Sequence, residues 1–350
     1  MFINTSQRNN PESSLLADDR FLRKVAAFYY MEGQTQEAIA THLYCSRQTI
    51  SKALQKAEDR GIIQIAVVPE ERTGYLHNLA HDLRFPLGLE ELLLVPGRYF
   101  DAEPSRNVID DIIADITATA ATYLDQVLTD RDILAVTGGR SIMRNVVRYL
   151  KPSKTLSNLQ VVPTIGFVET YISTGDSNLV AYDIANIYEA KHAWLPIPAI
   201  VETREQQEQA RALPLVREVF KLMEQATIIM MGIWTSDLDH DVIKRGILSQ
   251  EQLEAFRAYH PVADINHWVF DPQGHCINET LEPPPYYLTG LEIPRLQKRI
   301  KQGHTKVVLV AGASKSRIPA IRAALKAGIV NILITDHITA ELLKSEVDPL

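Results

Sequence analysis

The sequence predicts an α/β protein in which a small helical domain precedes a larger domain built around a mostly parallel sheet. Two observations predict this fold. Three helix-like patterns follow one another between residues 18 and 61, and short apolar runs alternate with helical stretches from residue 132 onward. Such alternation indicates crossover connections and a sheet that helices cover on both faces. A polar break, PEERTG at 69–74, separates the two patterns.

Composition limits the classes of protein to consider. The chain has 350 residues, of which 46% are hydrophobic, and this is enough for two domains. Residues 1–14 form a polar tail that lacks the pattern of an export signal, and no apolar run approaches the roughly 18 residues of a membrane span. We therefore expect a cytoplasmic protein. Cys45 and Cys276 lie in no CxxC pair and no zinc pattern is present, so we expect reduced thiols, no metal and no cofactor.

The charge is distributed unevenly. The whole chain carries a net charge of −7, but residues 20–60 contain seven Lys or Arg and four Asp or Glu, a local balance of +3. The rest of the chain therefore carries −10. A basic N-terminal domain on an acidic body is suited to phosphate contacts through that domain alone.

The N-terminal patterns predict three helices. The first begins after Asp18 and ends near Gly33. Thr35 caps a second helix that runs to Leu43, with Ala38, Ile39 and Leu43 facing inward. The residues YCS form a turn, and Ser46 caps a third helix that Gly61 ends. In that helix the apolar residues recur every three to four positions and must pack inward; they are Ile50, Ala53 or Leu54, and Ala57. IIQIAVV at 62–68 predicts a strand.

The third helix then presents a polar face that includes Arg47, Gln48, Ser51, Lys52 and Gln55. Arg can donate two hydrogen bonds to guanine, Gln can pair with adenine, and Ser or Lys can hold phosphate. The alternative is a solvated polar face, which the tight turn, the capped helix and the local basic charge make less favourable. The predicted DNA-binding residues are Thr35, Gln36, Ser46, Arg47, Gln48, Thr49, Ser51 and Lys52.

In the body, five apolar runs predict buried strands; they are DILAVTGG, LQVVPTIG, ATIIMMGIW, KVVLVAGAS and VNILITD. Ligands of parallel sheets bind at the carboxyl ends of the strands. VTGGRSI at 136–142 follows a strand and opens a helix, so its backbone N–H groups, Arg140 and Ser141 could hold an anion. VAGASKSRIPAI at 310–321 repeats the arrangement, with Gly312 at the turn and Lys315 as a point charge. The alternative for each is an ordinary strand-to-helix turn.

Other polar residues of the body carry weaker signals. Asp264 in HPVADINHWVFDPQGH either accepts hydrogen bonds from sugar hydroxyls or caps a turn. His267 and His275 fit packing or surface positions better than metal ligation, and Asp336 fits a cap of the last helix. Neither GxSxG nor HExxH occurs, and no pair of acids suggests a reaction.

These passages resemble a known family, the SorC-type transcriptional regulators. The matching stretches are TQEAIATHLYCSRQTISKALQKAEDRGII, ILSQEQL, PVADINHWVFDPQG and AGASKSRIPAIRAALKAGIVNILITDHITAELL. The resemblance implies an N-terminal helix-turn-helix and a sensor domain similar to ribose-phosphate isomerases, glucosamine-phosphate deaminases and CoA-transferases. It also implies dimers or tetramers and a phosphorylated sugar or polyol as effector. The residues implied to face that effector are Thr137, Gly138, Gly139, Arg140, Ser141, Asp264 and Lys315.

We therefore expect a helix-turn-helix domain at 15–68 and an effector domain at 69–350, of which 69–103 forms a linker or oligomerisation region. The expected function is regulation of a carbohydrate catabolic operon, with operator DNA, a sugar or polyol phosphate and further copies of the chain as partners. The alternative is a sugar-phosphate isomerase or deaminase with an added helical module. The basic helical domain separates the two, because an isomerase gains nothing from the outward polar face of the third helix.

Overall fold

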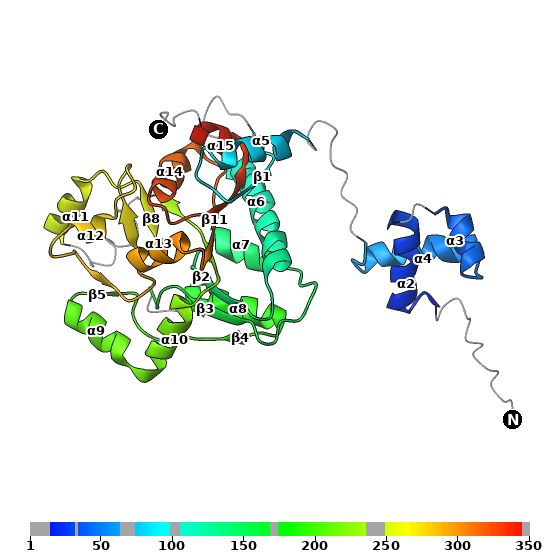
Figure 1. Ribbon diagram of the computed structural model, residues 1–350, viewed down its shortest axis with the longest axis horizontal. Helices are drawn as coiled ribbons and strands as arrows, with labels where there is room; N and C mark the ends of the chain where they lie inside the picture. The colour runs from blue at the N-terminus through cyan, green and yellow to red at the C-terminus, as the bar shows by residue number, and fades with distance from the viewer. Residues whose placement is uncertain are drawn as a thin grey trace. The chain divides into compact units, whose positions relative to one another are not determined.

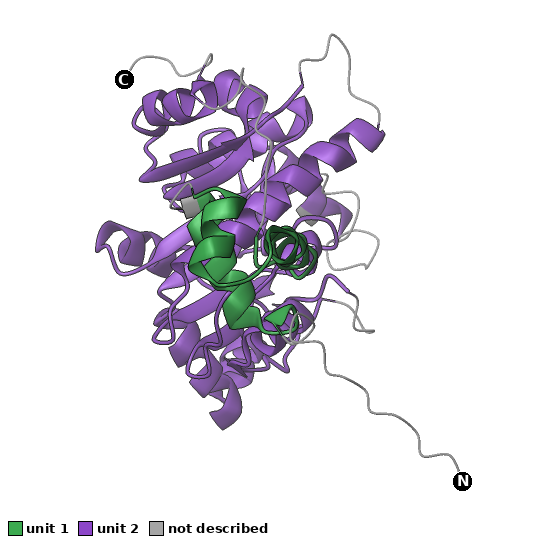
Figure 2. Ribbon diagram, turned by 90° about the vertical axis from the view of Figure 1, so that its right-hand side faces the viewer, with its two compact units in different colours: residues 1–70 green, residues 71–350 purple. Residues whose placement is uncertain are grey.

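The computed structural model describes residues 15–31, 34–63, 74–98, 106–168, 174–235 and 249–344. The chain divides into two compact units, residues 1–70 and 71–350 (Figure 2). The predicted boundary at residue 69 falls outside the described residues, as do the predicted helix stop at Gly33 and residues 64–68 of the predicted strand.

The first unit contains the three predicted helices. They are α2 (Asp19–Ala26), which continues as a π-helical turn (Ala27–Met31), α3 (Gln36–His42) and α4 (Arg47–Asp59). The predicted caps are confirmed, because Thr35 accepts a hydrogen bond from the Ala38 N–H at 3.2 Å and Ser46 accepts one from the Thr49 N–H at 3.0 Å. Both helices therefore begin where the sequence predicts.

The core of this unit is formed by all three helices. Its buried residues include Leu22, Val25, Ile39, Ile50, Ala53, Leu54 and Ala57. The prediction that Ala38 faces inward is wrong, because Ala38 is exposed and Ala40 is buried instead. At 3.6 residues per turn, Ala40 and Leu43 share a face with Ile39, and Ala38 falls on the opposite side.

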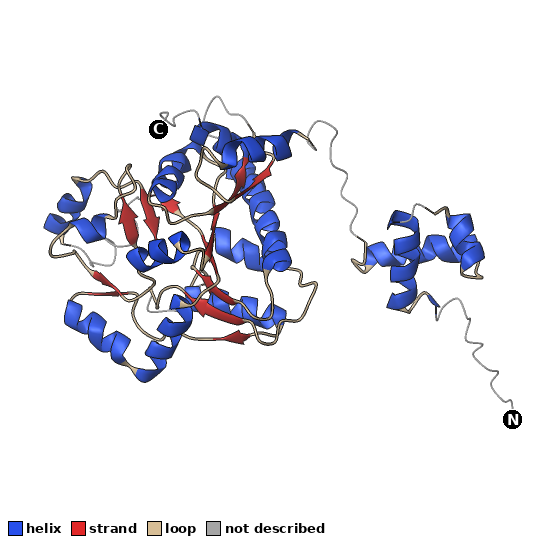
Figure 3. Ribbon diagram, in the orientation of Figure 1, coloured by secondary structure: helices blue, strands red, loops and turns tan. Residues whose placement is uncertain are grey.

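The second unit is built on a seven-stranded sheet in which every neighbouring pair is parallel (Figure 3). The strands are β1 (Glu91–Val95), β2 (Ile133–Val136), β3 (Gln160–Pro163), β4 (Lys191–His192), β6 (Ile228–Met231), β11 (Lys306–Val310) and β12 (Ile332–Asp336). Their order is β1-β12-β11-β6-β2-β3-β4. All five strands predicted for the region after residue 130 are present. The two-residue strand β4 is too short to give a pattern.

Helices cover both faces of the sheet (Figure 1). One face packs on α6 (Arg106–Val127), α7 (Ile142–Tyr149) and α8 (Ser177–Tyr188). The other packs on α5 (Tyr75–Arg84), α10 (Pro214–Glu224), α13 (Ile293–Lys301), α14 (Ile318–Lys326) and α15 (His337–Lys344). Successive residues of β6 alternate between these cores, with Ile228 and Met230 on the first face and Ile229 and Met231 on the second. Burial on both faces explains why the strands are continuously apolar.

Smaller elements extend the carboxyl edge of the sheet. An antiparallel sheet of β7 (Trp234–Thr235), β8 (Ala263–Ile265) and β9 (Trp268–Phe270) begins directly after β6. The remaining elements are β5 (Ile200–Val201), which pairs with β10 (Tyr287–Leu288), the helices α9 (Arg204–Ala212), α11 (Gln250–Arg257) and α12 (Ile277–Thr280), and the 3-10 turn η2 (Lys315–Arg317). Within the described ranges, no helix combines the length and apolar character that a membrane span requires.

Candidate functional site

Helix α4 presents a continuous polar face in the N-terminal unit. Arg47, Gln48, Ser51 and Lys52 are all exposed, while Ile50 and Ala53 on the opposite side are fully buried. The exposed side chains occupy the first turn and a half of the helix. A helix presented in this way can place donors against base edges and phosphates.

Thr49 corrects one predicted DNA contact. Its side chain is fully buried, and its hydroxyl lies 2.7 Å from that of Ser46. Together with the bond from the Thr49 N–H to Ser46, this contact closes the turn at the start of α4. Thr49 therefore has no surface to offer to DNA. Thr35 and Ser46 are exposed, but their hydroxyl oxygens already accept the capping hydrogen bonds.

Two features of this surface were missed from the sequence. The Arg47 Nε lies 2.9 Å from the Glu37 Oε1, so α3 places a carboxylate beside the guanidinium. Tyr44 in the turn has a φ of 52° and is 98% exposed. An aromatic hydroxyl that stands clear of the core can donate to a phosphate oxygen. The position of Tyr44 in the YCS turn was a usable signal, whereas the Glu37–Arg47 pair depends on how two helices cross.

In the second unit, the order of strands places the predicted effector residues along one edge. The loop 137–141 follows β2, and Lys315 follows β11, with β6 between these two strands. Asp264 in β8 pairs with Trp234 of β7, directly after β6. All three segments therefore lie at the carboxyl ends of adjacent parallel strands, where ligands of such sheets bind.

The loop 137–141 is held in place by the segment around Gly175, which lies beside it in the same chain. The Gly139 N–H donates to the Gly175 carbonyl at 2.8 Å, and a Cβ on Gly138 would overlap the same carbonyl oxygen. Thr137 is buried, and its hydroxyl accepts from the Gly232 N–H at 3.2 Å. The prediction of a row of backbone donors is therefore wrong at Gly139, whose N–H is occupied. Arg140 and the Ser141 side chain are exposed.

Asp264 is the central acid of this edge. Its Oδ1 accepts from the His267 N–H at 2.8 Å, and its Oδ2 lies 3.7 Å from the His267 Nδ1. Its side chain is 21% exposed. The turn-capping alternative is therefore confirmed, and the contact of Asp264 with sugar hydroxyls stays a prediction for a carboxylate that still reaches the surface. Nearby, the Asn266 amide donates to the Thr164 hydroxyl at 2.9 Å, which ties this turn to the end of β3.

A buried carboxylate shapes the turn that carries Lys315. Asp336 is 2% exposed and accepts hydrogen bonds from the Ala313 N–H at 2.7 Å, the Thr339 N–H at 2.9 Å and the Thr339 hydroxyl at 2.7 Å. The predicted cap of α15 is confirmed, and the additional bond to Ala313 was not expected. Gly312 has a φ of 150°, and a Cβ there would lie 2.6 Å from the Asp336 Oδ2. The turn therefore requires glycine at this position.

Lys315 is exposed at the mouth of a cavity of about 100 Å³. The cavity is also lined by Arg98, Ser314 and Thr339. Beside it, the Arg317 guanidinium donates to the Gly312 carbonyl at 2.8 Å; burial lowers the pKa of Arg317 and the Asp336 carboxylate partly opposes this. Neither Arg140 nor Asp264 lines this cavity. The predicted residues thus share one edge of the sheet, and of them Lys315 lines this cavity.

Comparison with known proteins assigns the chain to a family. Residues 75–344 match the family model described as "Putative sugar-binding domain". The chain belongs to the SorC family of transcriptional regulators. It is 25% identical to the deoxyribonucleoside regulator of Bacillus subtilis over 92% of this chain and 96% of that one. It is 22% identical to the sorbitol operon regulator of Klebsiella pneumoniae over 93% and 98%. The crystal structure of that full-length SorC protein superposes with a TM-score of 0.64 at 22% identity, covering 93% of this chain and 98% of the other.

Family membership settles the class of function. SorC-family proteins such as these relatives are transcriptional regulators, so the chain is a regulator and the isomerase or deaminase interpretation is wrong. Transcriptional regulation implies DNA as a partner, and a sugar-binding domain implies a sugar as effector. The likeness to the solved SorC structure supports the same α/β fold with its seven-stranded parallel sheet.

Proposed function

We propose that the chain is a sequence-specific DNA-binding regulator of a carbohydrate catabolic operon, and that a phosphorylated sugar or polyol controls its affinity for the operator. The observation that carries the DNA-binding half is the capped helix α4, whose first turns expose Arg47, Gln48, Ser51 and Lys52. This arrangement supplies both base-reading and phosphate-holding side chains on one face.

The carboxyl edge of the sheet supports the effector half. Arg140 and Lys315 provide positive charge on either side of Asp264, whose carboxylate suits a sugar hydroxyl. A phosphorylated polyol combines an anion with hydroxyl groups, so its chemistry complements this set. Two relatives are named deoxyribonucleoside regulator and sorbitol operon regulator, and both names refer to compounds that carry sugar or polyol hydroxyl groups.

Lys315→Ala should weaken the binding of a phosphorylated sugar about tenfold or more, because a charge-assisted hydrogen bond to phosphate is lost. The measurement is calorimetric titration of candidate sugar and polyol phosphates into both proteins, after a thermal-shift screen of the wild type. Lys151→Ala is the matched control, because it removes an exposed lysine away from this edge. Equal binding by the wild type and Lys315→Ala would remove Lys315 from the site.

The effector and the operator must be coupled reciprocally. An effector that weakens operator binding tenfold binds about tenfold more weakly to the DNA complex, a coupling of roughly 1.4 kcal/mol. Operator affinity is therefore measured with and without each sugar phosphate that binds. If the bound effector left operator affinity unchanged, its role as the controlling ligand would be rejected.

We expect a homo-oligomer, a dimer or tetramer, on a roughly palindromic operator. A single small domain with a local charge of +3 binds DNA weakly, and symmetry brings a second copy to the same site at high effective concentration. Light scattering at the concentration used for binding measures the subunit number. A monomer with full operator affinity would contradict this expectation.

A further inference from the structure

A cavity of about 290 Å³ lies between α10 and α13, on the face of the sheet that these two helices cover. Its floor is apolar, because Met223, Ile229 and Leu296 line it and are almost completely buried. Its wall carries five basic side chains and two carboxylates. None of the predicted effector residues lines it.

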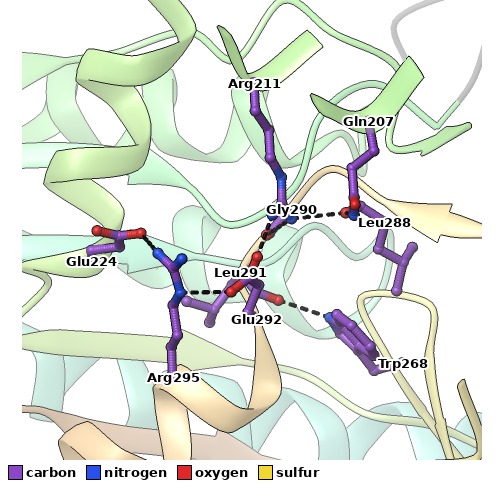
Figure 4. A network of polar contacts seen from close by, with 9 residues as sticks. All are labelled: Gln207, Arg211, Glu224, Trp268, Leu288, Gly290, Leu291, Glu292 and Arg295. Carbon is purple, nitrogen blue, oxygen red and sulfur yellow. Dashed lines mark hydrogen bonds and ion pairs between the residues drawn. The ribbon is translucent and has the colours of Figure 1, made fainter. Parts of the chain in front are cut away.

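The two carboxylates are already used within the wall (Figure 4). Glu292 pairs with Arg211 and, at 2.6 Å, with the Arg295 Nε, while Glu224 pairs with the same Arg295 guanidinium. Arg211 also donates to the Leu288 carbonyl at 2.9 Å. These bonds fix two guanidinium groups around the cavity and leave no acid of the wall for the remaining cations.

Two arginines supply the surplus positive charge. Arg217 on α10 is exposed, and its guanidinium makes no hydrogen bond or ion pair with the described residues. Arg299 on α13 donates to the carbonyls of Ala226 at 2.9 Å and His304 at 3.0 Å, and its Nε is buried without a partner among the described residues. Burial lowers the pKa of Arg299, and no nearby acid opposes the shift. A partly buried guanidinium whose Nε has no partner and which pairs with no carboxylate is a site that an anion stabilises.

We propose that this cavity binds a small organic anion with an apolar body, its phosphate or carboxylate against Arg217 and Arg299 and its apolar part on the floor of Met223 and Leu296. An inorganic anion would satisfy the arginines but leave the apolar floor in contact with water. An uncharged apolar molecule would cover the floor but leave the guanidinium groups without a counter-ion. Only a ligand with both properties offsets both costs.

The test uses the full-length protein and four probes in calorimetric titrations: phenyl phosphate, benzoate, phenol and inorganic phosphate. We expect binding of at least one of the two apolar anions, and weaker binding or none of phenol and inorganic phosphate. The tighter of phenyl phosphate and benzoate identifies the anionic group that the cavity prefers. If neither apolar anion binds, or if inorganic phosphate binds as tightly as the preferred probe, the proposal is overturned.

Variants locate the binding. Arg217→Gln and Arg299→Lys should each weaken the preferred probe about tenfold, because each removes hydrogen bonds to its anionic group. Arg148→Gln, an exposed arginine on α7, should leave binding unchanged. Binding must also persist in Lys315→Ala, which affects the carboxyl edge; loss there alone would assign the probe to that edge and overturn the proposal. Arg217→Gln could also change the subunit number while the probe still binds. That result would mean that this face is an interface between copies of the chain, and it would overturn the proposal.

Discussion

Replacing Arg47 with alanine should weaken operator binding by about 1–3 kcal/mol and relax specificity at one base position. The side chain is exposed at the start of α4, and it pairs with Glu37 of α3. The ion pair is solvent-exposed on both sides, so it contributes little to stability. Arg47→Ala should therefore lower the affinity for DNA without lowering the free energy of unfolding of the N-terminal unit appreciably. Fluorescence anisotropy with the operator and with single-base variants of it measures both effects.

Arg23→Ala is the matched control for this prediction. Arg23 is exposed on α2, and its removal changes the charge of the N-terminal unit by the same amount. A distant charge acts on all sequences alike, so this variant should keep the ratio of operator to scrambled-DNA affinity. The assignment of Arg47 to base reading fails if Arg47→Ala binds both DNAs as the wild type does, or loses the same affinity for each.

Asp336→Ala should destabilise the second unit by about 3 kcal/mol or more, because it leaves three donors without their acceptor. The carboxylate is buried, and it joins the turn that carries Lys315 to the start of α15. Its loss should therefore also remove the binding of sugar phosphates. Urea denaturation followed through the tryptophan signal gives the free energy of unfolding. All three tryptophans, Trp194, Trp234 and Trp268, lie in this unit.

Asp336→Asn serves as the graded control for that substitution. The amide keeps one oxygen acceptor and the size of the side chain, so it should lose less stability than alanine. If alanine and asparagine were both within about 0.5 kcal/mol of the wild type, the role assigned to Asp336 would be wrong, since that is the range of ordinary surface substitutions.

Local chemistry explains which features the sequence predicted. The caps at Thr35 and Ser46 and the buried positions Ile50 and Ala53 follow from contacts within a few residues, and they were predicted correctly. Thr49 was misassigned because a polar residue in the first turn of a helix appears available for DNA. Its hydroxyl instead bonds to the cap three residues earlier, which the sequence alone does not reveal.

Long-range contacts explain most of the rest. The alternation of strands and helices predicted a parallel sheet, but not that Glu91 of β1 pairs with Ile332 of β12. The loops that follow β2 and β11 were located correctly, because a strand end is a local signal. The bond from the Ala313 N–H to Asp336 and the arginine-lined cavity both depend on segments that are far apart in the chain. No pattern of spacing along one segment could predict them.

The pairing of β1 with β12 has a consequence for how the protein is made. In the seven-stranded sheet β1 has β12 as its neighbour, so the first strand to leave the ribosome has no partner until almost all of the second unit has been synthesised. The N-terminal unit, by contrast, closes its core from residues 16–63 alone. Domains that complete their contacts early can fold during synthesis, whereas a sheet closed by distant segments waits. The nascent chain can therefore fold the unit that carries α4 well before the sheet of the sugar-binding domain is complete.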